Sequence, residues 1–186
     1  NSGTLASRNS FVGLKGQFGT VVAGKIDMPF KSLEGGGTVT QLWGNADTPD
    51  VILNGKGTGR VIKDTIYNLH TRQTNVLQYW SPKFSNISVK LAYSPDEING
   101  AAGTNKLTNL GASIEFDNGT WNAGIAMENQ SNKTAVGQDL SGTKATAGYK
   151  FDQGTVGAGY STINNGAGKK TKNWVVTRLV QKAVLV

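Results

Sequence analysis

Residues 107–129 decide the fold class of this chain. They read Leu107-Thr-Asn-Leu-Gly-Ala-Ser-Ile-Glu-Phe116, then Asp117-Asn-Gly119, then Thr120-Trp-Asn-Ala-Gly-Ile-Ala-Met-Glu-Asn129. In both ten-residue runs an apolar residue alternates with a small or polar one, which is the two-residue period of a strand. Runs of this length, alternating in hydrophobicity and separated by turns, are typical of transmembrane β-barrel strands. The stretch therefore predicts an all-β chain in a membrane.

The same pattern recurs along the chain and predicts about nine antiparallel strands. The expected strands are 8–16, 20–27, 73–81, 87–94, 107–116, 120–129, 143–151, 155–163 and 173–181. Tight turns are expected at 17–19, 117–119 and 152–154, and a slightly longer one at 82–86. Asp-Asn-Gly and Asp-Gln-Gly suit hairpin turns because glycine can take a positive φ. Longer connections are expected at 95–106, 130–142 and 164–172. Short turns at one rim and long loops at the other are what outer-membrane barrels show.

The longest connection, residues 28–71, lies between two strand signals. Loops of this length are uncommon and usually functional. Its content of Leu, Ile, Val, Trp and Tyr argues against simple disorder. We expect it to fold against the inside of the barrel, although a disordered surface insertion is an alternative.

Aromatic residues gather near the expected strand ends. They are Tyr79, Trp80, Tyr93, Phe116, Trp121, Phe151, Tyr160 and Trp174. Aromatic girdles at the two membrane interfaces would explain this placement, and ordinary β-propensity is the alternative.

Composition excludes several other classes of protein. The chain has 186 residues, 25 glycines, no cysteine and a net charge of +7. Without a basic run interleaved with aromatics, the positive charge does not predict nucleic-acid binding. The only histidine is His70 and no nucleophile motif lies near it, so we predict neither an enzyme nor a cofactor. The sequence offers no spacing typical of a metal site.

Two phrases resemble a known family. Arg8-Asn-Ser-Phe-Val-Gly-Leu-Lys-Gly-Gln-Phe-Gly-Thr-Val-Val-Ala-Gly-Lys25 is similar to the hairpin before the constriction loop of general porins of Gram-negative bacteria, of the betaproteobacterial and neisserial type. Asn75-Val-Leu-Gln-Tyr-Trp-Ser-Pro-Lys-Phe84 resembles the hairpin after that loop. The resemblance covers roughly residues 5–176.

The resemblance implies a sixteen-stranded, trimeric barrel in the outer membrane, of which this chain supplies about nine strands. Residues 28–71 would be the inward-folded constriction loop. The tail 179–186 departs from the family pattern, so we expect a fragment lacking both ends or a frame change near Thr177. The implied partners are two further copies, outer-membrane lipid and lipopolysaccharide, and small hydrophilic solutes and ions.

The implied function is passive diffusion through a water-filled channel, with anion preference. A β-rich surface structural or adhesive protein without channel activity is the alternative. Strand alternation predicts a lumen face that carries Lys90, Asn109, Glu115, Asn122, Glu128, Lys144 and Lys150, together with Lys25 and Asp27. The expected pore-lining and constriction residues are Arg8, Lys25, Asp27, Glu34, Asp47, Asp50, Asp64, Arg72, Gln78 and Lys90.

Overall fold

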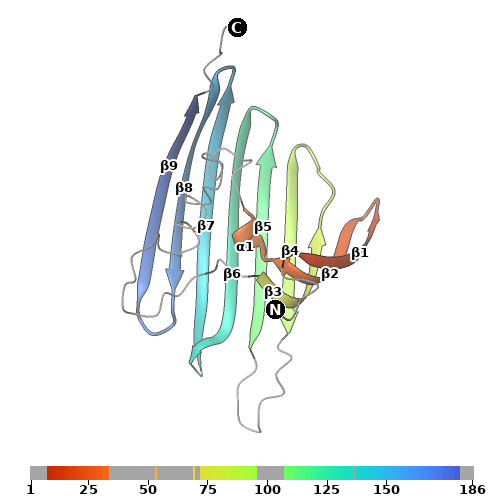
Figure 1. Ribbon diagram of the computed structural model, residues 1–186, viewed down its shortest axis with the longest axis vertical. Helices are drawn as coiled ribbons and strands as arrows, with labels where there is room; N and C mark the ends of the chain where they lie inside the picture. The colour runs from red at the N-terminus through yellow and green to blue at the C-terminus, as the bar shows by residue number, and fades with distance from the viewer. Residues whose placement is uncertain are drawn as a thin grey trace, which may run out of the picture.

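A single antiparallel sheet of nine strands makes up almost all of the described part of the chain (Figure 1). The computed structural model describes residues 8–33, 53, 69, 72–95, 107–135 and 137–180. The strands are β1 (Ser10–Gly16), β2 (Gly19–Asp27), β3 (Arg72–Trp80), β4 (Ile87–Pro95), β5 (Thr108–Asp117), β6 (Trp121–Ala135), β7 (Gln138–Phe151), β8 (Gly154–Asn164) and β9 (Lys170–Val180). They pair in chain order, which confirms the predicted all-β meander. Among the described strands, β1 and β9 are the two edges of an open sheet.

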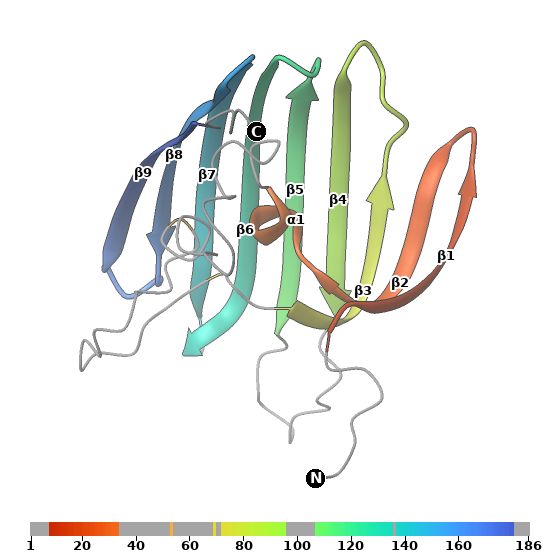
Figure 2. The ribbon, with the colours of Figure 1, turned by 45° about the horizontal axis from the view of Figure 1, so that its top comes forward.

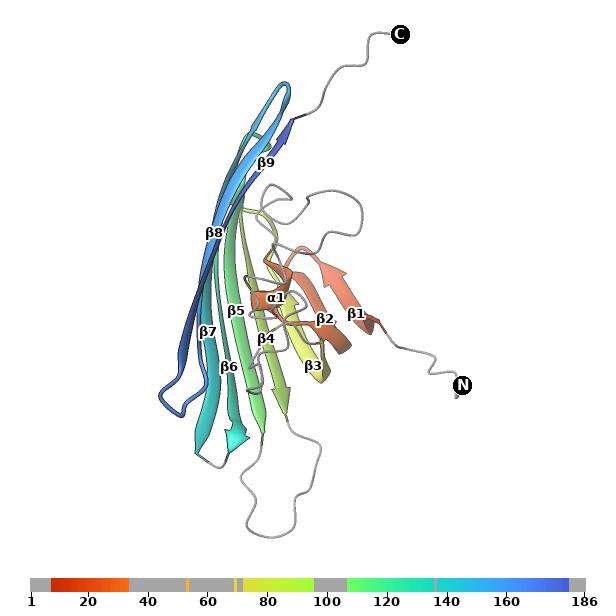
Figure 3. The same cartoon turned by 60° about the vertical axis from the view of Figure 1, so that its left-hand side comes forward.

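The sheet is strongly curved, and one short helix lies on its inner side. Seen edge-on, the strands bow around α1 (Pro29–Ser32) (Figure 3). This helix contacts β4, β5, β6 and β7, and Figure 2 shows it against the middle of the sheet. In the described part of the chain, no helix is long and apolar enough to cross a membrane.

The two faces of the sheet differ in the way residues 107–129 predict. On the convex face, large apolar side chains such as Leu110, Ile114 and Ile125 are more than half exposed. On the concave face, Gly111, Ser113 and their neighbours are buried beneath α1 and the residues around it. The convex face is therefore apolar and the concave face is small or polar.

Residues 117–119 form the predicted turn. Gly119 has φ +91°, and its N–H donates to the Asp117 carboxylate over 2.8 Å. The Asn118 side chain accepts from the N–H groups of Thr120 and Trp121. Gly154 differs, because it pairs with Phe151 as the first residue of β8 and needs no positive φ.

The predicted long connection 130–142 is wrong. Strand β6 continues to Ala135 and β7 begins at Gln138. Polar residues that suggested a loop are instead used for pairing: the N–H of Asn132, at φ +56°, donates to the Asp139 carboxylate. The connection 164–172 likewise shrinks to residues 165–169.

A bulge in β3 changes the expected alternation there. Asn75 has φ +55°, and the β2–β3 register shifts beside it. Thr74 is consequently exposed, whereas Val76 and Gln78 are buried. An uninterrupted strand would place Thr74 on the same face as Val76 and Gln78, but one inserted residue reverses the faces of the side chains that follow it.

Candidate functional site

The concave face is the candidate functional surface, because it gathers buried polar groups that an ordinary core would avoid. The buried polar residues that alternation assigns to it are Gln78, Ser94, Ser113, Asn122, Glu128, Gln130, Lys144, Thr146, Ser161 and Thr177. The Gln130 amide donates to Glu128 over 2.7 Å, and the Lys90 ammonium lies 2.9 Å from Glu115. Both signs of charge therefore lie on the inner face of the sheet.

Helix α1 is seated on this face by apolar contacts. Phe30 and Leu33 are buried with Ala126, Leu140 and Ile163, which belong to β6, β7 and β8. A proline at the first turn starts the helix, where its missing N–H costs nothing. The Phe30 ring also covers the Lys144 ammonium, which lies 5.1 Å from the ring centroid. Lys144 is fully buried, so α1 shields a positive charge on the sheet.

Glycines in the sheet make room for this helix and its neighbours. A Cβ atom at Gly111 would lie 2.9 Å from Pro29, and one at Gly142 would lie 3.0 Å from Phe30 and closer still to Leu69. Gly124 faces Leu33 in the same way. Each separation is shorter than van der Waals contact, so the sheet can carry no side chain at these three positions without displacing the segment above it.

Two further described residues between α1 and β3 also contact the concave face. The Leu53 carbonyl accepts a hydrogen bond from the Ser161 hydroxyl over 2.6 Å. Leu69 belongs to the buried cluster around Phe30. Contacts with the inner face thus occur at residues 29–33, 53 and 69.

A polar cluster joins the strand before α1 to the strand where the chain returns. The Asp27 carboxylate lies 2.6 Å from the Lys31 ammonium and 3.2 Å from the Arg72 guanidinium. Asn9 donates to Asp27 and accepts from Arg72 over 3.0 Å. Lys31 is buried and Arg72 half-buried, so this cluster, Asn9–Asp27–Lys31–Arg72, is only partly screened by water.

Comparisons with known proteins identify the family. The model described as Gram-negative porin matches residues 1–179. The chain belongs to the Gram-negative porin family. Its place is accordingly the outer membrane of a Gram-negative bacterium, and its nine strands are part of a porin barrel.

Individual curated porins align with only about half of this chain. Major outer membrane protein P.IB of Neisseria gonorrhoeae is 33% identical over 99 residues, which are 52% of this chain and 24% of that protein. The protein of that name from Neisseria lactamica is 31% identical over 103 residues, 55% of this chain and 27% of that protein. The match thus spans about a quarter of the length of these curated relatives.

A solved structure shows the same fold. The anion-selective porin from Comamonas acidovorans has a TM-score of 0.66 and 20% identity, covering 92% of this chain and 51% of that one. At this identity the likeness establishes the architecture alone, a curved antiparallel β-sheet.

Four of the ten predicted site residues make polar contacts on this porin sheet. Asp27 and Arg72 meet in the polar cluster, while Lys90 pairs with Glu115. Gln78 is buried; its amide donates to the Asp27 carbonyl over 3.4 Å and accepts from the Trp80 indole over 2.6 Å.

Arg8 and Lys25 do not join these contacts. Arg8 is exposed where the described chain begins. Val22 and Ile26 both pack in the buried cluster with Val76, so alternation puts Lys25 on the other face of β2. Asp27 has the same parity as Lys25, but it is the last residue of β2 and its carboxylate contacts Lys31 of the inner-side helix α1. The expected inward orientation of Lys25 is therefore a misassignment of strand parity. Glu34, Asp47, Asp50 and Asp64 lie outside the described residues.

Lys31 is the charged residue of the polar cluster that the sequence prediction missed. It stands four residues after Asp27, and Pro29 between them signals the start of a helix. That spacing could have predicted the ion pair, but the segment was treated as part of one long loop.

Proposed function

We propose that this chain forms part of the wall of a water-filled channel that passes small hydrophilic solutes and ions through the outer membrane. The observation that carries the proposal is the inner face, where polar side chains and both signs of charge lie opposite an apolar convex face. Water on the concave side and lipid on the convex side is the arrangement that satisfies both surfaces.

The proposed constriction is made by residues 28–71 against the concave face. The contacts of α1, Leu53 and Leu69 support this, because they belong to one connection and lie on one face. We propose that Asp27, Arg72, Gln78 and Lys90 line the narrow level together with Lys31. Arg8 and the carboxylates Glu34, Asp47, Asp50 and Asp64 complete the proposed set.

We further propose that the channel prefers anions. In the polar cluster two cations, Lys31 and Arg72, face one carboxylate, Asp27. The whole chain carries a net charge of +7. Fixed positive charge in a narrow passage raises the local concentration of anions. The related porin from Comamonas acidovorans is described as anion-selective, which agrees with this proposal.

The proposed assembly is a homotrimer in contact with outer-membrane lipid and lipopolysaccharide, and the proposed activity involves no bond-making step. A structural or adhesive surface protein is the competing function. It would require no open passage along the concave face.

Planar-bilayer recording of the intact protein tests the proposal. We expect stepwise conductance at low voltage. Across a gradient of KCl, we expect a reversal potential that shows preference for chloride over potassium. Conductance without anion preference would contradict the selectivity, and insertion without any conductance would favour the structural alternative.

A further inference from the structure

The bulge in β3 decides which residue stands opposite Asp27. Gly24 pairs with Val76, and Asp27 pairs with Arg72. Between these two pairs β3 contains one residue more than β2, and the register shifts there. In an uninterrupted ladder, counting on from the Gly24–Val76 pair would put Gln73 opposite Asp27. The bulge therefore absorbs one residue of β3 and brings an arginine to this position instead.

This placement determines the charge of the polar cluster. Arg72 lies 3.2 Å from the Asp27 carboxylate and donates to Asn9 over 3.0 Å. Directly opposed residues of an antiparallel pair have side chains close together on one face. A slip of one residue would carry Arg72 past Asp27 and turn its side chain to the other face. The neutral Gln73 would take its place, so the cluster would lose one of its two cations.

The backbone of the bulge needs particular residues on two neighbouring strands. Asn75 has φ +55°, a left-handed conformation that asparagine tolerates and that β-branched residues avoid. On the facing strand, Gly24 has φ +149°. A Cβ atom at Gly24 would overlap the Ser10 carbonyl of β1 and lie 2.7 Å from the Phe11 Cα atom. Both strands therefore carry a residue that permits the local distortion.

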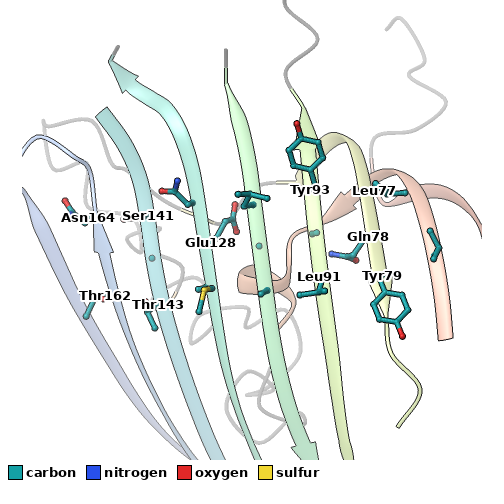
Figure 4. Close-up of a pocket in the computed structure, with 18 of the residues that line it drawn as sticks. Leu77, Gln78, Tyr79, Leu91, Tyr93, Glu128, Ser141, Thr143, Thr162 and Asn164 are labelled. Carbon is teal, nitrogen blue, oxygen red and sulfur yellow. The ribbon is translucent and has the colours of Figure 1, made fainter. Parts of the chain in front are cut away.

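Strand β4 supports the bulge from the opposite side. The pairing of β3 with β4 ends at Leu77 and Tyr93, so the ladder does not reach the bulge. The buried Ser94 hydroxyl donates to the Thr74 carbonyl over 2.7 Å, so a side chain satisfies this backbone acceptor. From Leu77 onward β3 alternates regularly, with Leu77 exposed and Gln78 buried (Figure 4). The distortion thus belongs to the first part of the strand.

We propose that Asn75 is a positioning residue for the channel. Its left-handed conformation holds the bulge, and the bulge holds Arg72 against Asp27, which sets the charge at the base of the long connection. The effect on ion selectivity rests on the proposed channel function, whereas the strand register does not. If the bulge served only the curvature of the sheet, the effect of changing Asn75 would not depend on which residue occupies position 72.

Paired cysteines in the intact protein measure the register without any ion flow. Directly paired residues of antiparallel strands lie close enough for a disulfide, and this chain contains no cysteine of its own. We expect Asp27→Cys with Arg72→Cys to cross-link more readily than Asp27→Cys with Gln73→Cys. Asn75→Val should reverse this order, because valine avoids the left-handed conformation. Asn75→Gly should keep the wild-type order.

Planar-bilayer recording then tests the consequence for selectivity. Asn75→Val should move the reversal potential toward cations, and adding Asn75→Val to Arg72→Gln should shift it no further than Arg72→Gln alone. Gln73→Arg added to Asn75→Val should restore the anion preference, because an arginine again stands opposite Asp27. The matched control is Asn86→Val, which changes an asparagine at φ +69° in the β3–β4 turn and should leave the reversal potential unchanged.

Three outcomes would overturn the proposal: an unchanged cross-linking order in Asn75→Val, a reversed order in Asn75→Gly, or an equal shift of the reversal potential by Asn86→Val. Heat-modified gel mobility shows whether each variant is folded. If Asn75→Val does not fold, Ser94→Ala replaces it, and an unchanged cross-linking order in that variant would equally contradict the proposal. A wild-type protein without anion preference would contradict the proposed selectivity, while the cysteine pairs would still decide the register.

Discussion

Asp27 is the central residue of the polar cluster Asn9–Asp27–Lys31–Arg72, because its carboxylate contacts both cations. Its carboxylate is shared between Lys31 at 2.6 Å and Arg72 at 3.2 Å, so one negative charge offsets only half of the positive charge around it. Because these side chains are mostly withdrawn from water, their field is screened less than that of surface ions. The cluster should therefore set the sign of the local ion excess at the base of the long connection.

Removing one of these cations should alter ion selectivity. Arg72→Gln leaves Asp27 balanced by Lys31 alone, so we expect the reversal potential in a salt gradient to move toward cations. The matched control is Arg178→Gln, which loses the same charge on the convex side of β9 and should not move it. The shift should fade near 1 M salt, where the Debye length is about 3 Å.

Neutralising the carboxylate should act in the opposite direction. Asp27→Asn keeps a polar side chain but leaves two cations unopposed, so the reversal potential should move toward anions. If Arg72→Gln and Asp27→Asn shift it in the same direction, the cluster does not act through its charge, and a displaced connection would be the better explanation.

At the scale of elements, α1 fits against the sheet because glycines there leave space for it. Gly111, Gly124 and Gly142 lie on three adjacent strands, and each leaves space for an atom of Pro29, Leu33, Phe30 or Leu69. Helix α1 has four residues and could not persist alone. Its position therefore depends on the fit between these glycines and the buried cluster around Phe30.

Filling one of these positions should release the helix. Gly142→Val would press on Phe30 and Leu69, and overpacking of this kind costs about 1–3 kcal/mol. The expected readout is faster tryptic cleavage after Lys31, a buried residue, by roughly 5- to 150-fold in the folded protein. Ala147→Val adds the same type of side chain to the exposed face of the same strand and should leave the cleavage rate unchanged. Equal cleavage in both variants would show that Gly142 does not seat α1.

The sequence could predict the strands better than their ends or the site. All nine strands were predictable because a two-residue alternation is set by local chemistry at each strand. The hairpin of β6 and β7 was too short in the prediction because Asn132 and Asp139 look like loop residues, yet they bond to each other across the pair. Lys25 was misassigned because alternation shows which residues of a strand share a face but not which face is the inner one. The buried cluster around Val22 was needed to identify the inner face of β2.

At the scale of the whole molecule, the sheet is inverted relative to a water-soluble β-sandwich. Its large apolar side chains, including Ile114, Ile125 and Val176, point outward and are more than half exposed. Its inner face holds Gln130, Lys144 and Ser161 with essentially no exposure. Such an outer surface is stable only where lipid covers it. The cost of placing a charge at each outward position should therefore show how far the hydrocarbon region extends.

The convex face predicts where the hydrocarbon region ends, because Ala112 and Met127 on β5 and β6 are followed across the sheet by Thr143 and Thr162 on β7 and β8. Ile125→Lys puts a charge among Ile114, Ala145 and other apolar neighbours, and should cost about 2–4 kcal/mol of folding free energy in a bilayer. Thr143 lies on β7 beside Thr162, two residues before Ala145, the residue that pairs with Ile125. Thr143→Lys should therefore cost about 0–1 kcal/mol, as it would at a membrane interface. The measurement is reversible urea unfolding of the intact protein in vesicles. Equal costs at the two positions would mean that the hydrocarbon region does not end between Ile125 and Thr143.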